Sequence, residues 1–170
     1  MSGRCLATPS GVRRLTAADG KLTEIVLTDR AGEDAPDPAT DRAAAQLTEY
    51  FAGKRKEFTL EVSPRGTPFQ LAVWETLAEV PFGRVVTYGD LARAIGRPTA
   101  CRAVANAVGK NPFLIVFPCH RVVAANGLGG FSAGIAVKRA LLRREQVKIS
   151  EKTAFSEKFF FTFPANRDTL

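Results

Sequence analysis

Histidine and cysteine are scarce in this sequence of 170 residues. There is one histidine, His120, and the three cysteines, Cys5, Cys101 and Cys119, form no CxxC pair. An odd number of isolated cysteines does not indicate a disulfide framework, so we expect reduced thiols. A zinc site requires several cysteine and histidine ligands, which this chain is poorly equipped to supply. We therefore expect no bound metal and no cofactor.

Long apolar runs and targeting signals are also missing. The longest apolar run, residues 113–117, has the length of one strand, whereas a membrane span needs about 20 residues. The N-terminus lacks the basic segment followed by an apolar one that marks a secretory signal. We expect no membrane partner and a cytoplasmic location, associated with the nucleoid, or a nuclear one in a eukaryote.

The charge of the chain is distributed unevenly. Hydrophobic residues make up 45% and charged residues 24% of the sequence, which is enough apolar material for a folded core. Residues 1–65 hold ten basic and ten acidic side chains, whereas residues 66–145 hold ten basic and four acidic ones. A local excess of positive charge is typical of proteins that bind DNA or RNA. A generally basic domain without such a partner is the alternative.

Residues 1–65 predict a small α/β domain with a short antiparallel sheet. The first 30 residues have strand character, and Asp19-Gly20 is a strong signal for a hairpin turn. Residues 31–40 contain two prolines and three acids and predict a loop, residues 41–51 predict a helix, and residues 56–62 predict a strand. Residues 63–66 read as a linker, so we place a domain boundary at residue 65.

Residues 66–148 predict a mainly helical domain. Thr67, Pro68 and Gln70 form the signature of a capping box at the start of a helix that Pro81 would stop. Residues 87–96 and 99–110 then predict two short helices joined by a tight turn, which is typical of a helix-turn-helix. We expect Thr87 and Thr99 to cap these helices. The predicted inner face of the second helix consists of Ala100, Ala103, Val104, Ala107 and Val108.

The remaining segments predict a strand at 113–117, a turn near Pro118, a glycine-rich loop at 126–134 and a helix through Lys138 to Glu145. The tail, residues 149–170, contains five of the twelve phenylalanines of the chain. We expect these rings to pack onto the domain, since an exposed aromatic cluster invites aggregation. A partner-binding patch is the alternative.

Cys119 and His120 are the strongest candidates for chemistry. A cysteine reacts as its thiolate and needs a nearby base or positive charge, and Cys119 is followed by His120 and Arg121. The alternative is a cysteine that merely packs in the core. Adjacent residues on a strand point to opposite faces, so Cys119 and His120 can cooperate only if the chain turns, as Pro118 would allow, or through a water molecule.

The sequence Pro118-Cys119-His120-Arg121, followed by two valines, resembles the active-site motif of the O6-alkylguanine-DNA alkyltransferases, also called methylated-DNA–protein-cysteine methyltransferases. The similarity covers residues 66–146. Residues 1–65 resemble the variable N-terminal domain of the family only loosely, and the tail shows no similarity to the family. Other segments that match in the order of the family are Pro81-Phe82-Gly83, Thr87-Tyr88-Gly89, Arg102-Ala103-Val104, Asn111-Pro112, and Lys138 with Leu141-Leu142 and Glu145.

The resemblance implies DNA repair by direct, stoichiometric and irreversible transfer of an alkyl group from O6-alkylguanine to Cys119. His120, reached through a water molecule and oriented by Glu145, would draw off the thiol proton, much as in a Cys-His-acid triad. Tyr88 would bind the flipped base and help neutralise the leaving guanine. Lys138 would lie near the O6 atom.

The resemblance also implies the surroundings of the acceptor. Asn111 would tie the recognition helix to the active-site turn. The guanine would meet the carbonyls of Cys119 and Val122 and the backbone N–H of Ser132. Three positions depart from the usual family residues, Phe131 from tyrosine and both Ala133 and Ala105 from glycine. The methyl of Ala133 would narrow the acceptance of bulky alkyl groups.

The implied partner is double-stranded DNA carrying O6-alkylguanine, bound by a monomer. The target atom is inaccessible inside a duplex, so the base must be flipped out, and Arg102 would enter the gap. The helix would lie in the minor groove, where small residues permit close approach. The residues expected to contact DNA are Thr99, Arg102, Ala103, Asn106 and Arg121.

Three other functions compete with this one. A lesion-binding relative without catalysis lacks the acceptor cysteine, which Cys119 supplies here. A cysteine hydrolase with turnover needs a histidine from elsewhere in space and an oxyanion site, yet His120 is the single histidine. A helix-turn-helix regulator needs base-reading polar side chains, and the alanine-rich helix offers few.

Overall fold

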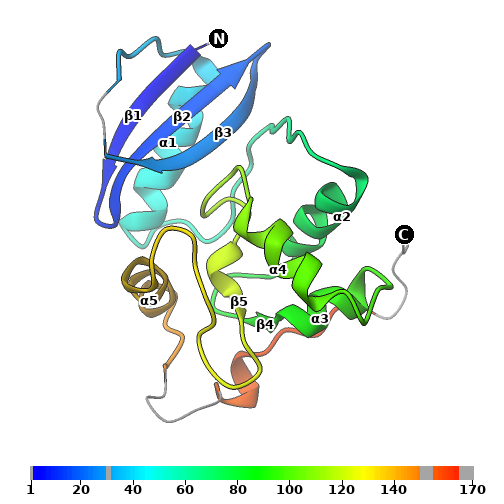
Figure 1. Ribbon diagram of the computed structural model, residues 1–170. Helices are drawn as coiled ribbons and strands as arrows, with labels where there is room; N and C mark the ends of the chain where they lie inside the picture. Colours follow the sequence, from blue (N-terminus) through cyan, green and yellow to red (C-terminus); the bar gives the residue numbers. More distant parts are fainter. Residues whose placement is uncertain (1, 30–31, 150–154, 165–170) are drawn as a thin grey trace. The chain divides into compact units, whose positions relative to one another are not determined.

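The computed structural model describes residues 2–29, 32–149 and 155–164 (Figure 1). It forms two compact units, Met1–Arg65 with Pro112–Val116 and Gly66–Asn111 with Phe117–Leu170. The first unit combines an antiparallel sheet with one helix and the second is mainly helical, so the fold is α+β as predicted. Within the described residues, no helix has the length and apolarity that crossing a membrane requires.

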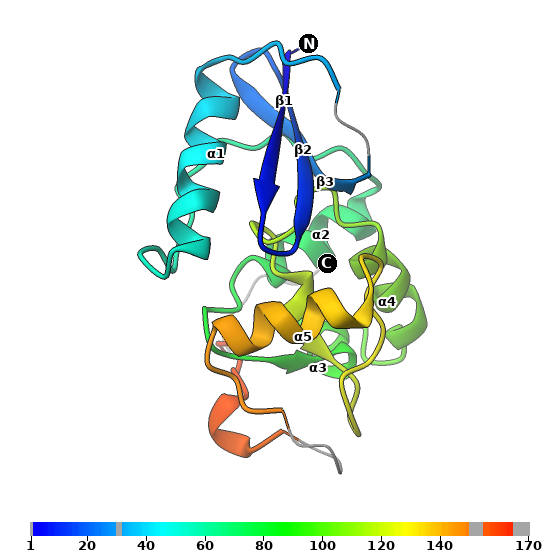
Figure 2. The ribbon, with the colours of Figure 1, turned by 90° about the vertical axis from the view of Figure 1, so that its left-hand side faces the viewer.

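The first unit is a three-stranded antiparallel sheet packed against one helix (Figures 1 and 2). Strands β1 (Ser2–Thr8), β2 (Gly11–Ala18) and β3 (Lys21–Thr28) are hydrogen-bonded in sequence order, and α1 (Pro38–Phe51) packs on the sheet. Asp19 and Gly20 have φ angles of 52° and 76°, which two-residue hairpin turns of type I′ require. The predicted hairpin is therefore confirmed.

Two predictions for the first unit are wrong. The helix begins at Pro38 rather than at residue 41, because Asp37 and Thr40 form a capping box inside the predicted loop. Residues 56–62 form no strand, and only Val62 makes an isolated bridge, with Leu22. The side-chain amide of Gln46 forms hydrogen bonds with both the N–H and the carbonyl of Thr59. In a strand, these backbone groups would instead pair with a neighbouring strand.

The second unit carries the segments that surround Cys119. Its helices are α2 (Pro68–Leu77), α3 (Tyr88–Ala94), α4 (Cys101–Gly109) and α5 (Ile135–Arg144). Two short strands, β4 (Val86–Thr87) and β5 (Val122–Val123), pair in parallel. Two turns of 3₁₀-helix, η1 (Cys119–Arg121) and η2 (Glu157–Phe159), complete the described elements.

The helix starts follow the predicted capping chemistry in two of three cases. Thr67 forms a capping box at α2 and Thr87 forms one at α3. Thr99, however, does not cap α4. It lies in a turn closed by the hydrogen bond from the Ala100 N–H to the Arg97 carbonyl, so Ala100 becomes the N-cap without a side-chain bond.

Helix α4 is buried along a narrower face than predicted. Val104, Ala107 and Val108 are buried, whereas Ala103 is exposed. The indole N–H of Trp74 on α2 donates to the Ala107 carbonyl over 2.8 Å in the interior. This buried bond joins α2 to α4 and leaves the other side of α4 open to solvent.

The predicted strand at 113–117 is buried but is not a strand. Phe113 makes a single bridge to Ile25, and the chain then turns at Ile115, whose φ is 74°. A positive φ is incompatible with an extended strand. The turn brings the chain to Pro118 and the Cys119 segment.

The phenylalanine-rich tail packs onto the second unit, as predicted. Phe155 is buried in a cluster with Val85 and Val123, and Phe159 and Phe160 pack against the same cluster. Residues 150–154 and 165–170 of the predicted tail segment lie outside the described residues.

Candidate active site

Cys119 opens a single turn of 3₁₀-helix directly after Pro118. The chain therefore turns at this point, and Cys119 and His120 do not lie on opposite faces of a strand. Cys119 is 2% exposed, and it lines a cavity of about 410 Å³. Pockets of this size typically hold small molecules or single chemical groups of larger ones. The sulfur is thus shielded from bulk solvent but borders a space that a ligand can enter.

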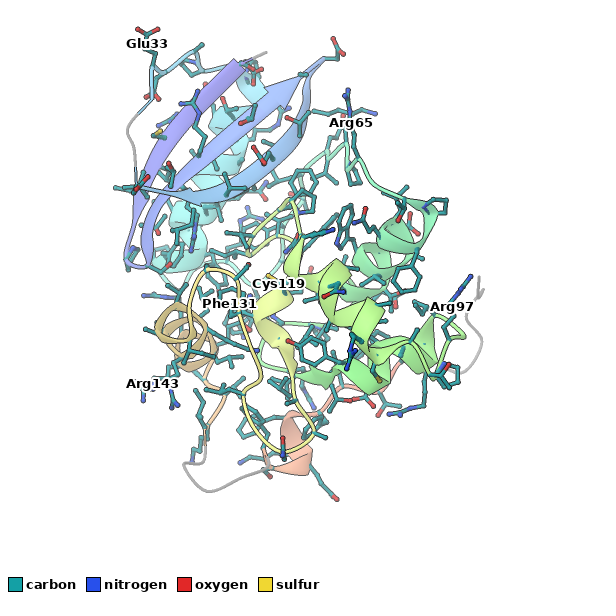
Figure 3. The ribbon with its side chains drawn as sticks, viewed as in Figure 1. Glu33, Arg65, Arg97, Cys119, Phe131 and Arg143 are labelled. Atoms are coloured by element: carbon teal, nitrogen blue, oxygen red, sulfur yellow. The ribbon has the colours of Figure 1, made fainter. Side chains whose placement is uncertain are left out.

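The cavity is built from the start of α3, the second half of α4 and the glycine-rich loop. Figure 3 shows two of its lining residues, Cys119 and Phe131. Phe131 and Ser132 line it as expected, but Val122 and Ala133 do not. The sequence did not point to Ala105, Val108, Gly109 or Gly130 as lining residues, although Ala105 and Gly109 lie one helical turn apart on α4. The complete lining is Tyr88, Ala105, Asn106, Val108, Gly109, Cys119, Gly130, Phe131 and Ser132.

The Glu145 carboxylate at the end of α5 binds three partners in the interior. Its Oε1 lies 2.7 Å from Nε2 of His120. Arg121 donates through Nε and Nη2, each over 2.8 Å, to the two carboxylate oxygens. The backbone N–H of Gly83 donates to Oε2 over 3.2 Å. Such full pairing is what allows a charged carboxylate to remain buried.

Electrostatics fix the charges of this network. Burial alone would raise the pKa of Glu145, but its interactions with His120 and Arg121 together outweigh burial and hold that pKa well below its usual range. Burial lowers the pKa of His120, against the attraction of Glu145. For this coupled pair we take the carboxylate as ionised and the imidazole as neutral, because the guanidinium of Arg121 already balances the one buried negative charge.

The neutral state determines the tautomer of His120. An ionised carboxylate only accepts hydrogen bonds, so Nε2 of His120 carries the proton and donates it to Glu145. Nδ1 is then the basic nitrogen. It is buried, and no hydrogen-bond partner for it is found among the described residues. His120 therefore holds an unprotonated nitrogen ready to accept a proton.

The resemblance placed Lys138 near the O6 atom of the substrate; in the structure Lys138 is not among the residues that line the cavity. Its buried ammonium donates to the carbonyls of Val122, Leu128 and Gly130 over 2.6, 2.5 and 2.9 Å. These three bonds use all the donors of a lysine. Burial lowers the pKa of Lys138 to about 8, partly opposed by attraction to Cys119. Lys138 thus fastens the glycine-rich loop to the segment that follows Cys119.

Arg121 does not lie where the sequence analysis predicted. The sequence placed it at the DNA, but it is only 5% exposed. Its Nη1 donates to the Val80 carbonyl over 2.7 Å, and the rest of its guanidinium binds Glu145. A buried guanidinium that donates through all three of its nitrogens to interior acceptors cannot reach a phosphate at the surface. Arg121 serves the interior network.

Two further predicted residues border the Cys119 segment. Asn111 follows α4, and its Nδ2 donates over 2.7 Å to the carbonyl of Phe117, two residues before Cys119. Tyr88 begins α3 and is half-buried at the cavity, where its hydroxyl lies 3.4 Å from the Gly130 carbonyl. Burial, followed by the nearby Cys119, raises the pKa of Tyr88. Tyr88 is therefore protonated at neutral pH and available as a donor.

The open side of α4 presents the other residues expected at DNA. Thr99, Arg102, Ala103 and Asn106 are all exposed. Asn106 also lines the cavity, so the exposed face of α4 and the Cys119 cavity share a border. In the part of the chain that the structure describes, no three His, Cys, Asp or Glu side chains gather as a metal site would need.

Comparison with known proteins agrees with this arrangement. A family model, "6-O-methylguanine DNA methyltransferase, DNA binding domain", matches residues 68–147. A methylated-DNA–protein-cysteine methyltransferase of Methanosarcina acetivorans is 48% identical over 61% of this chain and 67% of that protein. The crystal structure of Mycobacterium tuberculosis OGT in complex with DNA has a TM-score of 0.79 at 40% identity, covering 86% of this chain and 93% of that one.

Another sequence match is long enough to show the family of the chain. A methylated-DNA–protein-cysteine methyltransferase of Mycobacterium bovis is 42% identical over 150 residues, which cover 84% of this chain and 91% of that protein. An aligned region of this length includes residues of both compact units. The chain belongs to the methylated-DNA–protein-cysteine methyltransferase (O6-methylguanine DNA methyltransferase) family.

Proposed function

We propose that Cys119 is the residue on which this chain, a methylated-DNA–protein-cysteine methyltransferase, accepts the alkyl group of O6-alkylguanine. The family repairs DNA by alkyl transfer to a cysteine, and the chain has three free ones. Cys5 lies in the first unit and Cys101 is exposed on α4. Cys119 alone of the three lines the cavity, one residue from a buried neutral histidine. That juxtaposition carries the proposal.

The transfer begins with removal of the thiol proton. Nδ1 of His120 accepts it through one water molecule, and the Glu145 carboxylate, which Arg121 holds in place, stabilises the resulting imidazolium. The thiolate of Cys119 then attacks the alkyl carbon. A sulfur–carbon bond forms as the bond between carbon and O6 breaks, and its electron pair leaves with the guanine.

The leaving guanine carries the negative charge away from the reacting carbon. The Tyr88 hydroxyl, which its raised pKa keeps protonated, donates to the base and neutralises that charge. The backbone N–H of Ser132 and the carbonyl of Cys119, both from residues that line the cavity, orient the base. The thioether on Cys119 has no leaving group that could regenerate the thiol, so each molecule reacts once.

DNA reaches the cavity through the exposed face of α4. A guanine must leave the duplex to react, at a cost of a few kcal/mol, and Arg102 enters the gap that it leaves. Thr99, Ala103 and Asn106 contact the DNA beside it, and the excess positive charge of residues 66–145 holds phosphates of any sequence. Residues 1–65 serve as a structural domain, and the protein acts as a monomer in the reducing compartment that holds the DNA.

The direct test uses a duplex that contains one O6-methylguanine. Intact mass spectrometry and peptide mapping are expected to find one methyl group, on Cys119, and no more than one per molecule. Cys119→Ala is expected to abolish the transfer, whereas Cys101→Ala, the matched exposed cysteine, retains it. A methyl group on Cys5 or Cys101, or several turnovers per molecule, would contradict the proposal.

The pH dependence of transfer tests the role of His120. Burial holds the pKa of His120 below its ordinary value of 6.5, so the imidazole stays neutral until the pH falls below that value. The rate constant at saturating duplex is expected to stay level from about pH 7.5 to 6.5 and to drop only at lower pH. Rapid-quench measurements across this range check it. A rate that already declines steadily between pH 7.5 and 6.5 would exclude a proton acceptor with a lowered pKa.

A substitution at Arg102 can distinguish base flipping from the alkyl-transfer step. Arg102→Ala is expected to slow repair of the duplex by about tenfold or more, because the side chain no longer offsets part of the flipping cost. Transfer from free O6-methylguanine base, which needs no flipping, is expected to be unchanged. Arg143→Ala is the matched control, since Arg143 is also an exposed arginine but lies on α5. Equal losses with both substrates would contradict a flipping role.

A further inference from the structure

The two short strands of the second unit each adjoin a residue of the active site. Strand β4 runs directly into Tyr88, the first residue of α3. Strand β5 directly follows the η1 turn that holds Cys119. The strands are paired in parallel, with Val86 opposite Val122. The placement of Tyr88 relative to Cys119 therefore depends on a sheet of only two residues per strand.

The C-terminal tail adds a third segment to this sheet. The N–H of Val85 donates to the Phe159 carbonyl over 2.7 Å, and the N–H of Phe161 donates to the Val85 carbonyl over 2.9 Å. Phe160 forms a parallel bridge with Val85. Successive strand residues direct their backbone groups to opposite sides, and Val85 faces the tail whereas Val86 pairs with β5. The tail therefore pairs along the edge of β4 that is opposite to β5. The orange-to-red segment runs beside β4 in Figure 1.

Side-chain packing ties the same pieces together. Phe155 is buried with Val85 before β4, Val123 in β5, Leu142 in α5 and Val147 after α5. Leu142 lies between Lys138 and Glu145, two of the buried charged residues of the site. One aromatic ring from the tail thus belongs to a cluster with residues that adjoin β4, lie in β5 and α5, and follow α5.

Physical considerations show why the tail matters. A two-stranded sheet this short is at best marginal on its own. Without the tail, the N–H and carbonyl of Val85 would lose their partners, and the apolar cluster would be open on one side. A displacement of about 1 Å between reacting groups lowers a rate by about a hundredfold. The tail is therefore placed to control the geometry of transfer rather than the binding of DNA.

We propose that Phe155 and the tail segment 159–161 are positioning elements that hold the Tyr88 and Cys119 segments in register for alkyl transfer. The inference rests on the proposed function for the identity of the reaction, but the structural coupling that it asserts can be measured on unreacted protein. The full chain is compared with three variants, Phe155→Ala, Phe155→Leu and Phe163→Ala. Phe163 pairs with Phe161 and does not belong to the cluster, so it is the matched control.

Two properties of each variant are measured once circular dichroism has shown that it is folded. Hydrogen exchange of unreacted Phe155→Ala is expected to accelerate in peptides that contain residues 85–88 and 119–123, and to stay unchanged in the sheet of the first unit. At saturating duplex the rate constant of transfer is expected to fall by about ten- to a hundredfold, with the dissociation constant for DNA unchanged. Phe155→Leu, which keeps most of the buried volume, restores most of the rate, and Phe163→Ala behaves as the parent.

The opposite results overturn the inference. A folded Phe155→Ala variant with parental exchange and parental transfer rate shows that the tail does not position the site. If transfer and DNA binding both decrease in proportion to the amount of folded protein, the role of the tail is merely structural. Failure of Phe155→Leu to recover the transfer rate would lead to the same conclusion. If no cysteine of the parent protein becomes methylated, the proposed function fails. The hydrogen-exchange measurement still decides whether the tail holds these segments.

Discussion

The carboxylate of Glu145 is the group on which the site depends. Removing one partner from a buried ion pair typically costs about 3–5 kcal/mol, because the remaining charge is left uncompensated. Here three partners come from two other segments: His120 and Arg121 from the η1 turn, and Gly83 from the loop before β4. The end of α5, the cysteine turn and the approach to Tyr88 are therefore fixed by one buried anion.

The same arrangement gives the site its chemistry. Because Arg121 supplies the balancing charge, His120 need not be protonated to pair with Glu145, and its Nδ1 remains a base. Lys138, seven residues before Glu145 on α5, holds the carbonyls of Val122 and the glycine-rich loop. One helix thus anchors the acid–base network at its end and the cavity wall near its middle.

Local sequence signals predicted what depends on local chemistry. The Asp19-Gly20 hairpin and the capping boxes of Thr67 and Thr87 follow from the conformations that these residues prefer. The strand predicted at 56–62 was wrong because Gln46, distant in sequence, takes the backbone groups of Thr59. Tertiary competition of this kind leaves no mark in the alternation of apolar residues.

The site shows the same division. The motif around Cys119 pointed to the cysteine that lines the cavity, and Glu145 was correctly paired with His120. Arg121 was misplaced because an arginine in a basic segment looks the same in sequence whether it faces a phosphate or a buried carboxylate. Its burial becomes evident only when the end of α5 and the Val80 carbonyl meet it in space. For Lys138, likewise, nothing in the sequence indicates the three backbone carbonyls that its ammonium binds.

The protonation of His120 is the most direct test of this account. The chain has one histidine, so the imidazole nitrogen resonances in a nitrogen-edited NMR spectrum of the unreacted protein belong to it without ambiguity. At neutral pH the account predicts a neutral ring with its proton on Nε2 and an unprotonated Nδ1. An imidazolium, or a neutral ring protonated on Nδ1, would contradict it, because neither form can accept a proton from Cys119 at Nδ1.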